Sequence, residues 1–99
     1  MGKGSYAKTQ GVTWLGHSLT AFNGAGYADR DSPETFVDSY IAWKTMKGDQ
    51  NAIDLATQYR EVAEDVGRQM IENSHGAGKP MSKSTLKKFR EFYPPAANW

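Results

Sequence analysis

Residues 50–73 read QNAIDLATQYREVAEDVGRQMIEN, and this stretch has the clearest helical pattern in the 99-residue chain. Its apolar residues recur every three or four positions, which places them on one face of an α-helix. They are Ala52, Leu55, Ala56, Tyr59, Val62, Ala63, Val66 and Met70. On the opposite face, Arg60 and Glu64 stand at i,i+4, a spacing at which opposite charges stabilise a helix slightly. We therefore predict one helix over 50–73.

The segment before this stretch predicts a second helix, over 33–47. Ser32-Pro33-Glu34 combines a capping side chain, a proline for the first turn and an early acid. The apolar residues of 33–47 spread over more than half of the helix circumference, which is typical of a helix packed on several sides. Only a short link, Gly48-Asp49, separates the two helices. A short link predicts an antiparallel helix hairpin.

The two ends of the chain carry weaker patterns. Residues 1–11 are polar and contain glycine, so we predict a flexible lead-in. Spacings of three, four and three then indicate a possible short helix over 12–22, with Val12, Leu15, Leu19 and Phe22 on one face. A last helix is predicted over 82–93, before Pro94-Pro95, and residues 94–99 form a tail.

Together these patterns predict an all-α fold in a single domain over residues 1–99. It has three to four helices built on the antiparallel hairpin, preceded by an irregular glycine-containing N-terminal segment. The apolar content of 38% is enough for a packed core and too high for an intrinsically disordered chain.

Composition narrows the function classes. The chain has no cysteine, which excludes disulfides and thiolate metal sites. Its apolar runs are far shorter than the roughly 18 residues of a membrane span, and its N-terminus lacks the apolar core of a signal peptide. We expect a soluble cytoplasmic protein with no membrane partner.

Several motifs approach a catalytic or binding signature without completing it. Gly76-Ala-Gly-Lys79 lacks both the earlier glycine and the following Ser or Thr of a phosphate-binding loop. Ser84-x-x-Lys87 has the spacing of a serine acylase but none of the accompanying motifs. His17 and His75 lie far apart, with no second ligand at metal-binding spacing. We therefore predict no enzyme activity, no cofactor, no metal and no small-molecule substrate.

Charge is distributed unevenly along the chain. Residues 29–78 carry ten acidic and five basic side chains, whereas residues 79–99 carry five basic side chains and one acid. Basic side chains on a helix can bind phosphates, so the nucleic-acid-binding candidates are Lys83, Lys87, Lys88 and Arg90. Two alternatives stay open for these residues: a solvated surface, or a contact with the acidic face of the 50–73 helix.

Aromatic residues suggest a different function. Trp14, Tyr27 and Trp99 lie in glycine-rich or terminal segments, where burial is hardest to guarantee. Because Trp and Tyr are preferred anchors of protein interfaces, these three are the protein-interface candidates. We expect a small helical protein-binding module that acts as an adaptor, an inhibitor or a minor subunit, with another protein or itself as partner. The alternative is a nucleic-acid-binding protein that uses the basic C-terminal helix.

Overall fold

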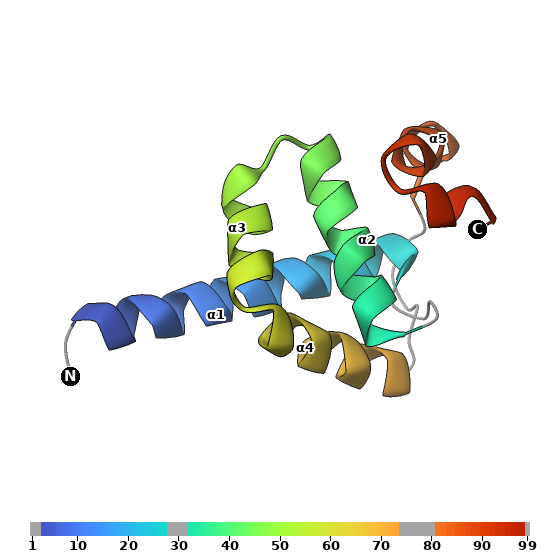
Figure 1. Cartoon of the computed structure of the whole chain (residues 1–99). Coiled ribbons are helices and arrows are strands. Elements are labelled where there is room, and N and C mark those ends of the chain that lie inside the picture. The colour runs from blue at the N-terminus through green and yellow to red at the C-terminus, as the bar shows by residue number, and fades with distance from the viewer. Residues whose placement is uncertain (1–2, 28–31, 74–80, 99) are drawn as a thin grey trace.

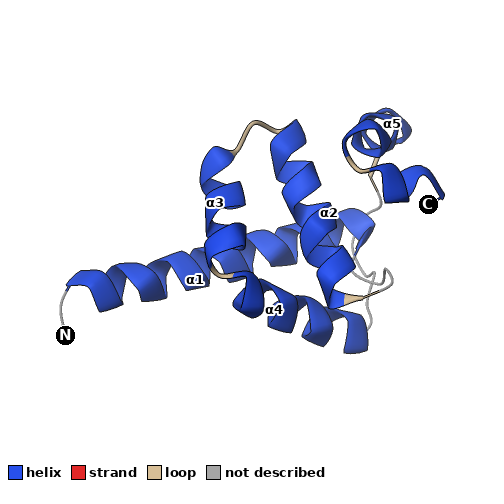
Figure 2. Ribbon diagram, in the orientation of Figure 1, coloured by secondary structure: helices blue, strands red, loops and turns tan. Residues whose placement is uncertain are grey.

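The computed structural model describes residues 3–27, 32–73 and 81–98, and within these ranges the fold is all-helical, as predicted (Figures 1 and 2). The elements follow one another as α1 (Lys3–Phe22), the π-helical turn η1 (Asn23–Tyr27), α2 (Pro33–Met46), α3 (Gln50–Gln58), α4 (Arg60–Glu72), α5 (Lys83–Phe92) and the 3-10 helix η2 (Pro94–Asn98). In this described part of the chain, no helix has the length and apolarity needed to cross a membrane.

Helix α2 lies at the centre of the fold and packs against α3, α4 and α5 (Figure 1). It begins where the sequence places a cap: the Ser32 hydroxyl accepts a hydrogen bond from the backbone N–H of Thr35 at 3.2 Å, and Pro33 starts the first turn. Its side chains Phe36, Val37 and Tyr40 are fully buried. The wide apolar surface of α2 is therefore covered on several sides.

An aromatic cluster joins α1 to α2. The ring of Phe22, from the end of α1, lies 5.3 Å from Phe36, 5.6 Å from Tyr40 and 5.2 Å from Trp43, measured between centroids. The Tyr40 hydroxyl also forms a 2.5 Å hydrogen bond with the Ser18 hydroxyl on α1. Burial raises the pKa of Tyr40, an effect that the Ser18 hydrogen bond partly offsets. These contacts fix the side of α1 that faces the core.

The helix predicted over 50–73 is not continuous, and this prediction was wrong. The chain bends at Tyr59, where φ is −112° and ψ is 43°, so α3 ends at Gln58 and α4 begins at Arg60. The backbone remains hydrogen-bonded through the bend, because Tyr59 donates to Leu55 and accepts from Ala63. On the two sides of the bend, α3 and α4 each contact both α1 and α2. A single straight helix would move away from these two helices at one of its ends.

Small residues bring α3 and α4 close to the rest of the core. The fully or largely buried positions of the two helices are Ala52, Ala56, Ala63 and Gly67. At Gly67 the approach is so close that a Cβ atom would lie 2.8 Å from Cδ1 of Phe36. Gly67 is thus required by the packing of α4 on α2.

The N-terminal segment is also not the flexible, irregular lead-in that was predicted over 1–11. Residues from Lys3 onward belong to α1, whose first turns extend beyond the other helices (Figure 1). No proline interrupts this segment, so a helix fixed further along can propagate towards the N-terminus. Helix α1 is held in place by its contact with α3 at Gly11, where a Cβ atom would lie 3.3 Å from Cδ2 of Leu55.

Candidate functional site

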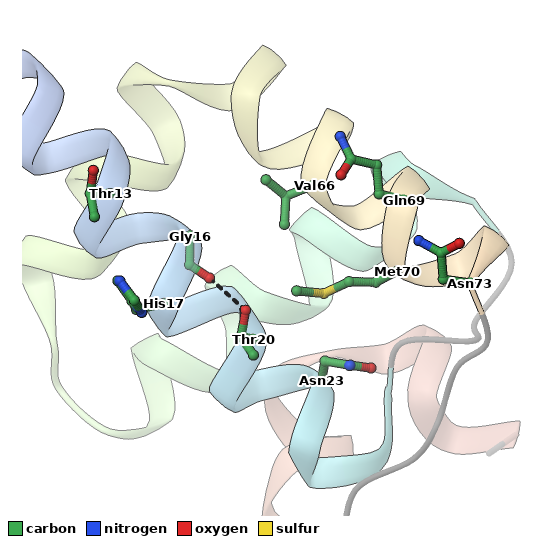
Figure 3. Close-up of a pocket in the computed structure, with 9 residues that line it drawn as sticks. All are labelled: Thr13, Gly16, His17, Thr20, Asn23, Val66, Gln69, Met70 and Asn73. Carbon is green, nitrogen blue, oxygen red and sulfur yellow. Dashed lines mark hydrogen bonds between the residues drawn. The ribbon is translucent and has the colours of Figure 1, made fainter.

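A groove of about 570 Å³ lies between α1 and α4 (Figure 3). The described residues of its walls combine hydrogen-bonding side chains with apolar ones, and none of these described residues is a carboxylate, lysine or arginine. The residues that line it are Thr13, Gly16, His17, Thr20, Asn23, Val66, Gln69, Met70 and Asn73. Its volume is within the roughly 300–1,000 Å³ of ligand-binding clefts. The lining suits a ligand that offers hydrogen bonds together with apolar contact.

Helix α1 supplies one wall because its apolar face is taken up by the core. Leu15, Leu19 and Phe22 are fully buried. The helical repeat then places Thr13 and His17 on the exposed side, towards the groove. Thr20 lines the groove as well, but its hydroxyl donates to the backbone carbonyl of Gly16 at 2.9 Å and is already engaged (Figure 3).

Among the described residues, no packing contact requires glycine at position 16. A Cβ atom built there meets nothing within 4 Å, whereas at Gly11 and Gly67 it would meet neighbouring side chains at 3.3 Å and 2.8 Å. Glycine inside a helix costs about 1 kcal/mol relative to alanine. Packing against described residues therefore explains why positions 11 and 67 are glycine. It does not explain the glycine at position 16 in the groove wall.

Asn23 provides an unused acceptor in the same wall. Its Oδ1 atom is buried and accepts no hydrogen bond from the described residues. A buried acceptor without a donor costs about 1–3 kcal/mol. Because this atom is buried, a ligand could donate to it only after the Asn23 side chain turns towards the groove.

Of the three predicted interface residues, Trp14 is the one whose side chain the structure describes. It is 41% exposed on α1 and follows the lining residue Thr13 in the sequence, but it is not among the described residues that line the groove. The side chain of Tyr27 and the whole of Trp99 lie outside the described residues. The exposed indole therefore adds apolar surface to α1 outside the groove lining.

The predicted nucleic-acid residues fall into two groups. Lys83, Lys87 and Lys88 are exposed on α5, and none of them forms an ion pair with another described residue. Arg90 is partly buried, and its Nε donates to the backbone carbonyl of Ala96 at 3.3 Å. Within the described residues, α5 packs on α2 rather than on the acidic face of α4. The structure therefore leaves three of the four candidates exposed on α5, with Lys83 and Lys87 on one face of the helix and Lys88 beside it.

Other features of the described chain offer less chemistry. Across residues 3–27, 32–73 and 81–98, no three His, Asp or Glu side chains are placed to hold a metal ion. A smaller hollow at the bend is lined by Thr57 to Val62. There the guanidinium of Arg60 is held by Asp38 and Glu64, and the hydrogen bond to Asp38 is the main cause of its raised pKa.

Sequence reasoning did not find the groove. Its two walls come from residues 13–23 and 66–73, segments far apart in the chain, and neither contains a motif of fixed spacing. The one available signal was Gly16, a glycine inside an otherwise regular apolar repeat. Comparison with known proteins adds no further signal, since no family model, no curated protein and no solved structure matches the chain.

Proposed function

We propose that this chain is a small protein-binding module whose α1–α4 groove receives a segment of a partner protein. The observation that carries this proposal is Gly16, which costs helix stability in the free protein and opens the groove wall. A glycine in this position permits the backbone or a side chain of a partner to approach α1 closely. An adaptor, an inhibitor or a minor subunit of a larger assembly would act through such a surface.

The groove lining favours a polypeptide as the occupant. A polypeptide segment presents a backbone N–H at every residue except proline, and these groups can donate to the polar side chains that line the groove. Its side chains can contact Val66 and Met70 inside the groove, and the exposed Trp14 follows the lining residue Thr13 on α1. We assign no catalytic role, because none of the described residues that line the groove is a carboxylate, cysteine or serine that could act with His17.

Site-specific photo-cross-linking tests this proposal. A photoreactive amino acid at Thr13 probes the groove, and the same amino acid at Thr45, an exposed residue on α2, serves as the matched control. We expect one protein to be captured from position 13 and not from position 45. Met70→Glu places an unpaired charge in the groove and should lower that yield by about tenfold or more. Equal capture from both positions, or capture unaffected by Met70→Glu, would contradict the proposal.

A second candidate function is nucleic-acid binding by α5. It is supported by the exposure of Lys83, Lys87 and Lys88 and by their lack of ion pairs among the described residues. If three lysines neutralise three phosphates, the logarithm of the affinity for an oligonucleotide falls with the logarithm of salt with a slope of about −2 to −3. Replacing all three lysines by glutamine should abolish binding. Binding that ignores salt or survives this replacement would exclude α5 as the contact.

A further inference from the structure

We infer that the basic surface of α5 in one copy of this chain binds the outward surface of α4 in a second copy. The inference goes beyond the proposed function, because it concerns the outward surface of α4, whose residues do not line the groove, and names a second copy as the partner. The partner is a second copy because the basic surface of α5 and the acidic surface of α4 have complementary charges but do not meet within one chain.

The outward surface of α4 is acidic. Glu61, Asp65, Arg68 and Glu72 are all exposed and follow one another at spacings of four, three and four, which places them on one stripe. Arg68 is engaged within the helix, where it pairs with Asp65 at 3.3 Å. Glu61 and Glu72 form no ion pair with another described residue. The stripe therefore has an excess of negative charge that no described residue neutralises.

The outward surface of α5 is its counterpart. Lys83 and Lys87 stand four residues apart, a rise of about 6 Å along the helix, and Glu61 and Asp65 on α4 have the same spacing. Two lysines can thus face two acids at once. One turn beyond Lys88, Phe92 is 47% exposed and adds apolar surface to the same helix.

The two surfaces cannot satisfy one another in a single copy. Helices α4 and α5 each pack on α2 rather than on one another, and α5 lies apart from α4 in Figure 1. Of the ion pairs between described residues, none joins a lysine of α5 to an acid of α4. The attraction between these surfaces is therefore available to a second copy.

A charge-swap experiment tests this inference. The first variant replaces Lys83, Lys87 and Lys88 by glutamate, and the second replaces Glu61, Asp65 and Glu72 by lysine. In each variant alone, α4 and α5 carry like charges, so sedimentation velocity should find a monomer of about the 11.0 kDa chain mass. In the mixture, each variant's α5 is complementary to the other's α4, and a heavier complex should form. All six positions are exposed, and circular dichroism checks that both variants remain folded.

The wild-type protein gives an independent measurement. It should self-associate at an ionic strength of about 0.05 M, and its association constant should fall by about tenfold or more at about 0.5 M. A wild-type protein that stays monomeric at low salt, or a variant mixture that stays monomeric, overturns the inference. Monomeric wild type that binds a single-stranded oligonucleotide through the three lysines overturns it in favour of nucleic-acid binding. Neither result affects the cross-linking test of the groove, so the two failures are distinguishable.

Discussion

The two sides of α4 are built differently. The side towards α2 is closed, because Ala63 and Gly67 let the helix lie so near that a Cβ on Gly67 would lie 2.8 Å from the Phe36 ring. The side towards α1 leaves a groove of about 570 Å³, with Val66 and Met70 on its α4 wall. One helix therefore has a side that contributes to stability and a side that stays available for binding.

This difference shows that a glycine cannot be interpreted from its helix alone. Gly67 and Gly16 both lie inside helices and both cost helix propensity. At Gly67 the cost is offset by the contact with Phe36, whereas at Gly16 no contact with a described residue offsets it. The first glycine is a packing residue, whereas the second is the residue on which the proposed binding function rests.

The largest expected loss of stability is on the side of α4 that packs against α2. Phe36→Ala removes a fully buried ring from the contact with Gly67 and Phe22, and it should lower the free energy of unfolding by about 3–5 kcal/mol. Met70→Ala, on the groove side and only partly buried, is the matched control and should cost clearly less. Urea denaturation compares the two variants. Equal losses would remove the distinction between the two sides.

The next largest loss of stability is expected when Gly67 itself is replaced. Gly67→Ala should lower the free energy of unfolding by about 1–3 kcal/mol, because the Phe36 ring is fully buried and has little freedom to move away from the new methyl group. Alanine has the better helix propensity, so a loss of stability here can only come from packing. Thermal unfolding measures it, and adding Phe36→Leu should recover part of the loss. A stabilised Gly67→Ala variant would contradict the close approach of α4 to α2.

Tyr40, a buried residue of α2, should make the free energy of unfolding depend on pH. Burial is the main cause that raises the pKa of its phenol above the ordinary value of 10.0. The folded protein thus favours the neutral phenol, whose contribution to stability is complete below pH 10.0 and is lost as pH rises through the folded pKa. Chemical denaturation at a series of alkaline pH values should show this loss. Tyr40→Phe should flatten the decline, and an unchanged decline would assign it to other groups.

The smallest loss of stability is expected next to the bend between α3 and α4. Asp38 accepts a hydrogen bond from Arg60, but the side chains are 49% and 40% exposed, so solvent screens the pair. Asp38→Asn should therefore cost less than about 1 kcal/mol. Denaturation at low and high salt measures it. A larger loss that persists in high salt would mean that this pair fixes the bend.

The sequence was sufficient where a local signal determines the backbone. Ser32-Pro33 marks the start of α2, and Asp49 caps α3 by accepting a hydrogen bond from the backbone N–H of Ala52. Gly48, with φ of 72°, adopts the left-handed conformation that favours glycine between them. Each of these signals acts over a few residues and needs no knowledge of the tertiary structure.

The sequence was insufficient where the tertiary structure decides. The apolar repeat of residues 50–73 continues through Tyr59, so the bend has no local signal and follows from packing on α1 and α2. The groove was missed for a similar reason. Residues such as Thr13 and Gln69 are ordinary solvated residues on separate helices until the fold places them on opposite walls.

The measurement that tests the central claim most directly is the free energy of unfolding of Gly16→Ala. If Gly16 serves a partner rather than the packing of this chain, alanine finds open space and better helix propensity, and the variant should be more stable by up to about 1 kcal/mol. Gly67→Ala, measured under the same conditions, should change in the opposite direction. A Gly16→Ala variant that is less stable than the wild-type protein would contradict the account, because Gly16 would then be needed by the fold itself.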